Sequence, residues 1–331
     1  MDNIALLYLI VALTLAFEFS NGWHDAANSI ATVVSTRVLT PLAAVVWAAF
    51  WNFVAAFAFG TAVAKTIGRG MVHIEMVNED VLLAGLVGAI LWNLLTLYLG
   101  IPTSSSHALM GGYGGAAVAR VGMQALIPGG WTKPVLFLFL APFMGLLMGL
   151  LVTVVTSWVV RRQAPNRVDR WFRRLQLISA AAYSIGHGTN DAQKGMGIIT
   201  AALVTGGLLR DYSVPFWVII ACHAAMAGGT MAGGWRVVRT MGQRITKLTP
   251  FGGFAAETAG AIMLFGTAQA GIPVSTTHTI AGSIMGVGAA RRLTAVRWGV
   301  TRQLMAVWVM TIPGAALFGA LLYQVFRLRG H

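Results

Sequence analysis

Apolar segments, most of them about the length that a helix needs to cross a bilayer, fill nearly all of this chain. Apolar residues make up 57% of its 331 residues and charged residues only 10%, against about 25% charged in soluble domains. A chain with so few charges cannot cover a water-soluble globule, so the sequence predicts an all-α polytopic membrane protein. The segments, about ten in number, are 4–36, 42–64, 81–99, 101–119, 134–160, 175–209, 214–235, 251–270, 272–290 and 303–326.

The sequence also excludes several other classes of protein. Cys222 is the only cysteine, so no internal disulfide can form. The apolar stretch 4–17 follows no basic region and precedes no small-residue cleavage site, which favours a retained first span over a targeting peptide. The sequence has no Walker-type nucleotide loop. Transport by such a chain is therefore expected to be driven by an ion gradient.

The net charge of +13 indicates orientation in the membrane rather than a nucleic-acid partner. Six arginines lie between residues 161 and 174, and such basic connections stay on the cytoplasmic side. Counting ten crossings outward from there places 15 of the 23 lysines and arginines on the cytoplasmic side of the inner (plasma) membrane. It places both termini on the outer side. The same count favours 101–119 and 272–290 as full crossings over segments that dip in and return.

Two of the segments are too long for one plain crossing and are polar in the middle. They are 4–36, with its polar residues around 21–25, and 175–209, with its polar residues around 186–191. Irregular backbone at membrane depth is tolerated only against protein or a watery cavity. We therefore expect broken helices that meet near the midplane and form a site there.

The two halves of the chain resemble one another. Gly-Ile-Pro-Thr-Ser-Ser-Ser-His at 100–107 matches Gly-Ile-Pro-Val-Ser-Thr-Thr-His at 271–278, and His-Asp-Ala at 24–26 matches Asn-Asp-Ala at 190–192. Because half of ten crossings is an odd number, the second half must be inverted relative to the first. Inverted repeats with broken helices are typical of secondary transporters. The expected units are a first inverted repeat 1–160, a basic cytoplasmic connection 161–174 and a second inverted repeat 175–331.

Ionisable residues inside the expected spans are candidates for a coupling site, because a charge inside a membrane is costly to keep. Asp25 and Asp191 occupy matched positions in the two halves and predict a cation or proton site at each helix break. The alternative for Asp191 is a structural ion pair with Lys194, one helical turn later. Glu18 and Glu257 are weaker candidates, since either could lie near a helix end and reach water.

Two hydroxyl runs, 103–106 and 275–277, each follow Gly-Ile-Pro and precede a glycine-rich stretch. Proline opens helices and hydroxyls cap them, so each run predicts a helix N-terminus inside the protein. Free N–H groups, the positive end of the helix dipole and hydroxyl donors together make an anion site. Two such ends would hold a small tetrahedral anion from opposite sides. Plain capping and close packing of small residues are the alternative.

Histidines accompany both kinds of motif. His107 and His278 close the two hydroxyl runs, and His24 precedes Asp25. The duplicated pair is a candidate for carrying protons or for a hydrogen bond to the anion, with a packing role as the alternative. A closed zinc site is not expected, because there is one cysteine and no pair of closely spaced histidines.

At these residues the chain resembles the inorganic phosphate transporter (PiT) family over nearly its whole length. The resemblance rests on Asn-Gly-Trp-His-Asp-Ala-Ala-Asn at 21–28, Gly-His-Gly-Thr-Asn-Asp-Ala-Gln-Lys-Gly at 186–195 and the paired Ile-Pro-x-Ser-x-x-His runs. It implies symport of orthophosphate, held between the two broken regions. The expected phosphate-binding residues are Asn28, Ser104, Ser105, Ser106, Asn190, Gln193, Ser275, Thr276 and Thr277. The expected coupling residues are Asp25, Asp191, Lys194, Glu18, Glu257, His24, His107 and His278, with Asp25 and Asp191 also expected to meet a metal.

One departure from the family pattern bears on the coupling ion. Sodium-coupled members carry Asn-Asp-x-x-Asn in both halves, whereas this chain has His-Asp-Ala-Ala-Asn at 24–28 and Asn-Asp-Ala-Gln-Lys at 190–194. The Lys194 ammonium is a tethered monovalent cation that could occupy the sodium volume and neutralise Asp191. We therefore expect proton coupling, as in the bacterial branch that the chain resembles, with phosphate entering free or as a neutral metal–phosphate complex.

Several alternatives stay open at this point. They are sodium-coupled phosphate symport, a sulfate or other oxyanion permease on the same scaffold, and a passive anion channel. An enzyme is not expected, because the motifs form two half-sites rather than one asymmetric triad. The expected partners are phosphate and the lipid bilayer, and a homo-oligomer is possible. No cofactor is expected other than the coupling ion, which is a proton or, as the alternative, sodium, and a co-transported divalent metal.

Overall fold

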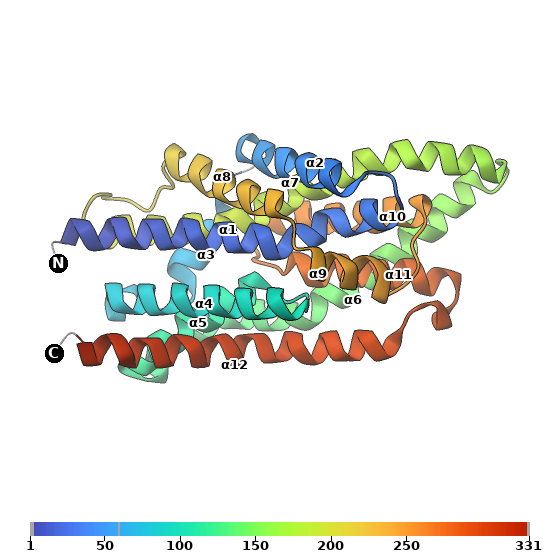
Figure 1. Ribbon diagram of the computed structural model, residues 1–331. Helices are drawn as coiled ribbons and strands as arrows, with labels where there is room; N and C mark the ends of the chain where they lie inside the picture. The colour runs from blue at the N-terminus through green and yellow to red at the C-terminus, as the bar shows by residue number, and fades with distance from the viewer. Residues whose placement is uncertain (1–2, 59, 330–331) are drawn as a thin grey trace.

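The computed structural model describes residues 3–58 and 60–329, and within them the protein is built from α-helices (Figure 1). The expectation of an all-α fold is confirmed. The helices are α1 (Asn3–Ser35), α2 (Pro41–Val54), α3 (Ala62–Gly70), α4 (Glu79–Leu99), α5 (Ser105–Val121), α6 (Pro128–Val160), α7 (Pro165–Thr205), α8 (Phe216–Ala232), α9 (Trp235–Arg239), α10 (Pro250–Gln269), α11 (Thr276–Arg291) and α12 (Trp298–Arg329).

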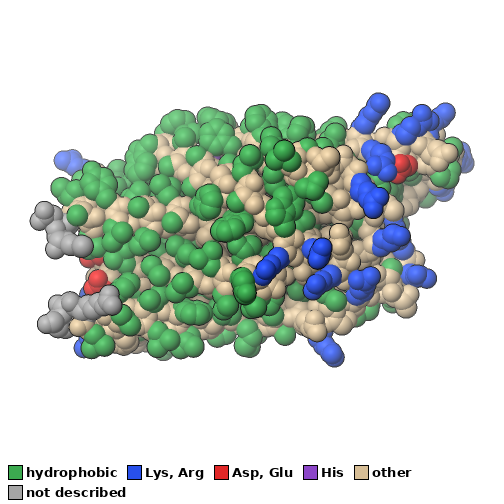
Figure 2. All heavy atoms as spheres, viewed as in Figure 1, with side chains coloured by type: hydrophobic (Ala, Val, Ile, Leu, Met, Phe, Trp, Pro, Cys, Tyr) green, Lys and Arg blue, Asp and Glu red, His purple; other side chains and the backbone are tan. Residues whose placement is uncertain are grey.

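Several of these helices are suited to crossing a bilayer. By length and composition, α1, α4, α6 and α12 each qualify among the described residues, and the bent pairs α2–α3 and α8–α9 add two more candidates. The long helices lie side by side along one axis, and both ends of the chain lie at the same end of the bundle (Figure 1). Lysines and arginines gather at the opposite end, beyond a wide apolar band (Figure 2).

The polar stretches 21–25 and 186–191 do not break their helices, so that expectation was wrong. Both lie inside single helices, α1 of 33 residues and α7 of 41 residues. Their glycines serve close packing instead. A Cβ at Gly22 would collide with the carbonyl of Met226 on α8, and one at Gly188 would lie 2.6 Å from the carbonyl oxygen of Asn52 on α2. The long helices can therefore pass closely without any interruption of their backbones.

The breaks lie instead between α4 and α5 and between α10 and α11. The segment before α4 pairs with the segment after α5, because the N–H of His73 donates to the carbonyl of Ala125 at 2.9 Å. The segment before α10 likewise pairs with the one after α11, with the N–H of Arg297 donating to the carbonyl of Ile245 at 3.0 Å. Each helix pair therefore forms a hairpin that returns to the end of the bundle from which it started.

The turns of the two hairpins come from opposite ends of the bundle and contact each other, so the expectation that 101–119 and 272–290 cross completely was wrong. The returning helices have 17 and 16 residues. At about 1.5 Å per residue each is roughly 25 Å long, short of the roughly 30 Å thickness of bilayer hydrocarbon. The first hairpin (α4–α5) and the second hairpin (α10–α11) start from opposite ends of the bundle and meet inside it (Figure 1).

Matched glycines let each hairpin pack against a long helix. A Cβ at Gly115 on α5 would collide with the carbonyl of Ala316 on α12, and one at Gly286 on α11 would collide with the carbonyl of Leu146 on α6. Small residues allow backbones to approach closely in membranes, where helix association depends on packing. Both hairpins are thus held by backbone-to-backbone contact along their returning helices.

Replacing Gly286 with alanine is expected to lower the free energy of unfolding by about 1–3 kcal/mol, the usual cost of overpacking. The measurement is thermal unfolding of the purified protein in detergent. Gly266 on α10 is the matched control, because nothing lies within 4 Å of a Cβ built there. Equal melting temperatures for G286A and G266A would contradict this view of the contact.

Candidate functional site

The two hairpins meet through their turns. Each turn begins at a glycine with a left-handed backbone, Gly100 with φ of 69° and Gly271 with φ of 64°. The hydroxyl of Thr277 donates to the carbonyl of Thr103 at 3.0 Å, which ties the second turn to the first. A left-handed residue reverses the chain directly after a helix, and glycine adopts it without strain. The turn glycines therefore bring the two hydroxyl runs together.

The serine directly before each returning helix serves as its N-terminal cap. The hydroxyl of Ser104 accepts the N–H of His107 at 3.3 Å, and the hydroxyl of Ser275 accepts the N–H of His278 at 3.1 Å. The N-termini of α5 and α11 therefore lie inside the protein. Free N–H groups and the positive ends of the helix dipoles favour negative charge at this point.

Asp25 on α1 faces both hairpins. The hydroxyl of Ser105 donates to its carboxylate at 2.8 Å, and the hydroxyl oxygen of Thr277 lies 3.3 Å from the same carboxylate. His24 Nδ1 lies 2.8 Å from the same carboxylate. Asp25 therefore connects α1 to the start of α5 and to the start of α11.

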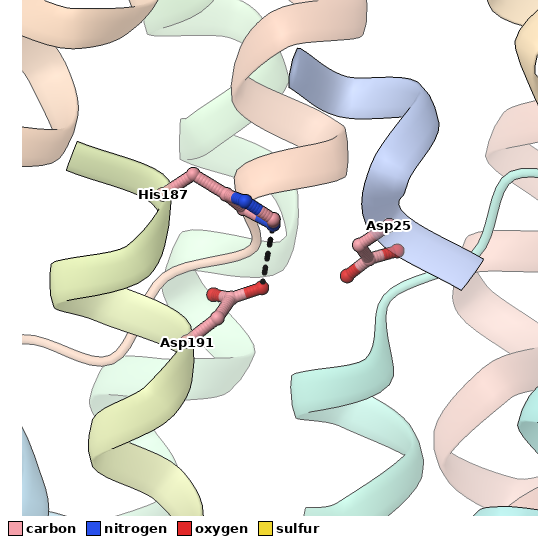
Figure 3. Close-up of side chains that lie close together, drawn as sticks. All are labelled: Asp25, His187 and Asp191. Atoms are coloured by element: carbon pink, nitrogen blue, oxygen red, sulfur yellow. Dashed lines mark ion pairs between the residues drawn. The ribbon is translucent and has the colours of Figure 1, made fainter. Parts of the chain in front are cut away.

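Asp191 on α7 faces Asp25 across the same space (Figure 3). Lys194 Nζ lies 2.6 Å from one of its oxygens, and the hydroxyl of Thr276 donates to the other at 3.1 Å. His187 Nε2 lies 3.3 Å from that second oxygen. Asp25, His187 and Asp191 each present a ligand atom within 4.8 Å of the others, which fits a divalent cation.

Asn28 supplies a neutral donor between the two carboxylates. Its amide donates to the hydroxyls of Thr276 and Thr277 at 3.2 Å and 2.9 Å. These groups form what we call the central cluster. Its members are Asp25, Asn28, Ser105, Asp191, Lys194, Thr276 and Thr277.

The central cluster holds more acidic than basic groups when the neighbouring His24 and His187 are neutral. Asp25, Asp191 and Lys194 are at most 1% exposed, so two carboxyl groups and one amine lie out of contact with water. Burying an uncompensated charge is costly. The arrangement therefore favours the binding of an additional cation or proton beside an anion held by the hydroxyls and helix N-termini.

The comparison with known proteins assigns this architecture. Over residues 21–319 the sequence matches the phosphate transporter family. The chain belongs to this family. A "probable low-affinity inorganic phosphate transporter" of Rhizobium meliloti (strain 1021) is 53% identical over 96% of each chain, and one of Bacillus subtilis (strain 168) is 43% identical over 99% of each chain.

A solved structure resembles this chain over nearly the full length of both proteins. This structure, described as the sodium-dependent phosphate transporter, is 24% identical, covers 98% of this chain and 99% of its own, and has a TM-score of 0.86. By its family, the protein is a multi-pass membrane transporter with phosphate as its substrate, and it is not an enzyme. The resemblance to phosphate transporters found in the sequence is confirmed.

Three residues expected to bind phosphate have structural partners away from the central cluster. The side chain of Gln193 accepts the N–H groups of Val63 and Ala64 at 2.9 Å and 3.1 Å, and so caps α3. The amide of Asn190 donates to backbone carbonyls on α7 and α10. Ser106 donates to the carbonyl of Val274 at 3.4 Å, a contact between the two turns.

The two buried glutamates lie outside the central cluster. Glu18 accepts the N–H of Gly195 at 2.7 Å and the amide of Asn21 at 3.3 Å. Glu257 accepts hydrogen bonds from Gln176 and Ser179 on α7. Both are fully buried, so neither reaches water at a helix end as the sequence had suggested.

The expected histidine pair lies at the contact between the hairpins. The rings of His107 and His278 are 5.0 Å apart, and His278 stacks on Trp308 of α12 at 4.1 Å. His24 instead joins the central cluster through Asp25. Its Nε2 lies 3.1 Å from the hydroxyl of Thr96 on α4.

His187 was not among the residues expected at the site. It lies four residues before Asp191, a spacing that places two side chains on the same face of a helix. That signal was present in the sequence. It carried no weight there because residues 186–191 were expected to form a break.

Proposed function

We propose that this transporter carries phosphate in symport with protons. The observation that carries the proposal is the buried ion pair between Lys194 Nζ and Asp191, 2.6 Å apart. The ammonium occupies one oxygen of the carboxylate and supplies a permanent positive charge. Asp191 then has little need of a sodium ion. Among the described residues, Asp25 forms its ion pair with His24, a group that is charged only when protonated.

The same geometry supports phosphate over sulfate. The hydroxyls of Ser105 and Thr276 and the Asn28 amide now donate to the two carboxylates and to one another. On binding they would turn their hydrogens toward the oxyanion, beside the N–H groups of two helix N-termini. Phosphate carries a P–OH at neutral pH and donates a hydrogen bond to a carboxylate, whereas sulfate has no proton to donate. A buried carboxylate left without a donor disfavours the wrong anion.

Matched contacts of the two hairpins support an inverted repeat. Thr240, in the π-helical turn after α9, donates to the carbonyl of Gly100 at 2.9 Å. Thr66 on α3 donates to the carbonyl of Gly271 at 2.9 Å. We take the basic end of Figure 2 as cytoplasmic, which leaves both termini outside the inner membrane. Alternating access would then move one hairpin turn at a time.

A neutral metal–phosphate complex is the alternative cargo. Asp25, Asp191 and His187 would meet the metal, and the hydroxyls of Ser105, Thr276 and Thr277 would meet the phosphate. The metal would travel as substrate in this scheme, with carboxylate and imidazole ligands as divalent cations accept.

The experiment is uptake of radiolabelled phosphate into proteoliposomes. An inward proton gradient without sodium is expected to drive accumulation above the external concentration, and an inward sodium gradient at equal pH is not. Added magnesium distinguishes free phosphate from the metal complex, and excess sulfate is expected to compete poorly. Accumulation driven only by sodium would refute proton coupling, while flux without accumulation would indicate a passive pathway.

A further inference from the structure

A cavity of about 320 Å³ lies between the turn of the first hairpin and the short helix α9. Arg236, Arg239 and Arg244 line it, together with Gly100 of the turn. All three arginines are exposed. The cavity is therefore a concentrated positive site on the basic side of the central cluster.

The guanidinium groups that line this cavity are not paired with carboxylates of the described chain. Among the described residues, none of the three arginines forms an ion pair. Arg236 donates to the carbonyl of Tyr98 and lies over its ring, 4.8 Å from the centroid. No side-chain hydrogen bond of Arg239 or Arg244 is found within the described part of the chain. Guanidinium groups are well suited to planar, bidentate recognition of phosphate groups.

A second cavity of about 430 Å³ adjoins the first and shares Tyr98, Trp235 and Arg236 with it. The rest of its lining is mostly apolar and includes Leu94 and Leu97 of α4. Leu94 is 39% exposed and Tyr98 is 69% exposed, so the groove opens to the outer surface of the bundle. Exposed Trp and Tyr residues are typical of the boundary between hydrocarbon and water.

We propose that the two cavities together bind one anionic phospholipid. The phosphate group of the lipid lies among Arg236, Arg239 and Arg244, and an acyl chain lies along Leu94 and Leu97. Basic pockets between membrane helices bind anionic head groups in this way. The continuity of the arginine cavity with an apolar groove favours a lipid over free phosphate, which has no apolar part to bury.

The site also contacts a moving part of the proposed transport cycle. Thr240 lines the arginine cavity and donates to the carbonyl of Gly100 in the hairpin turn. A lipid bound there packs against this contact. The lipid therefore holds α9 and the turn together on the basic side.

The test is native mass spectrometry of the purified protein in detergent, titrated with phosphatidylglycerol or phosphatidylcholine. The variant is R239Q/R244Q, and the control is R162Q/R170Q, which removes one exposed arginine between α6 and α7 and another from the start of α7. One arginine near a lipid phosphate contributes about a fivefold change in affinity. The variant is expected to lose roughly 25-fold in phosphatidylglycerol affinity, and the control to lose little.

Melting temperatures of both variants check that the fold is intact. Equal binding of the two lipids by the unchanged protein, or an equal loss in R239Q/R244Q and R162Q/R170Q, would overturn the proposal. So would displacement of phosphatidylglycerol by millimolar inorganic phosphate, since that result assigns the cavity to free phosphate. Failure of proton coupling in the uptake experiment would leave this lipid site unaffected.

Discussion

Replacing Lys194 with asparagine is expected to make phosphate uptake depend on sodium. The change removes the ammonium that lies 2.6 Å from Asp191 and leaves a fully buried carboxylate without its cation. Sodium is small enough to enter the vacated volume and can take oxygen ligands from the new amide, Asp191 and Thr276. The measurement is the initial rate of uptake at rising sodium concentration and constant pH, for the unchanged protein and for K194N.

Stability provides a second readout of the same change. Removing one partner of a buried ion pair usually costs about 3–5 kcal/mol. K194M is therefore expected to unfold at a lower temperature than the unchanged protein, and K194M/D191N to recover much of that loss without recovering uptake. In K194N, sodium is expected to raise the melting temperature. Uptake and melting of K194N that both ignore sodium would show that the lysine does not replace a sodium ion.

Replacing Asp25 with asparagine is expected to lower phosphate uptake about a hundredfold. The new side chain has nearly the same shape, but it carries no charge to accept the P–OH of phosphate or to hold a proton. Loss of a buried hydrogen bond to a charged group costs up to about 3 kcal/mol, roughly a hundredfold in rate or affinity. D25N is also expected to discriminate less between phosphate and sulfate, which competition during uptake measures.

Glu257, which the sequence placed among the coupling residues, provides the comparison for Asp25, because the structure places it outside the central cluster. It is also a buried carboxylate, but its hydrogen-bond partners are Gln176 and Ser179 rather than the hairpin turns. E257Q is expected to retain most of the phosphate uptake and all of the preference over sulfate. A loss in E257Q as large as the loss in D25N would place the essential carboxylate outside the central cluster.

The charges of the loops argue against 101–119 or 272–290 dipping in alone, but they do not reveal a hairpin made of two helices. A hairpin that dips in and two helices that cross completely both return the chain to the same side. The turns at 100–104 and 270–275 carry no charged residue that would distinguish the two cases. The sidedness of every basic loop is therefore the same in both, although the paths of α5 and α11 differ.

The position of Asp25 beside the second hydroxyl run could be anticipated, because both belong to motifs that recur in the two halves. The orientation of neighbours on α7 could not. On a continuous helix, successive side chains are rotated by about 100°, so His187, Asp191 and Lys194 share one face. Asn190 and Gln193 then point elsewhere, and their amides bind backbone groups of α10 and α3. Because a break was expected in this segment, the helical spacing of these residues was not applied.

The most direct test of proton coupling is the reversal point of phosphate flux in sodium-free proteoliposomes. The membrane potential is held at zero, a phosphate gradient is fixed, and the pH gradient at which net flux changes direction is determined. Proton symport predicts that a larger inward proton gradient reverses a larger outward phosphate gradient, and that added sodium leaves the reversal point unchanged. A reversal point that follows the sodium gradient and ignores pH would contradict the role assigned to Lys194.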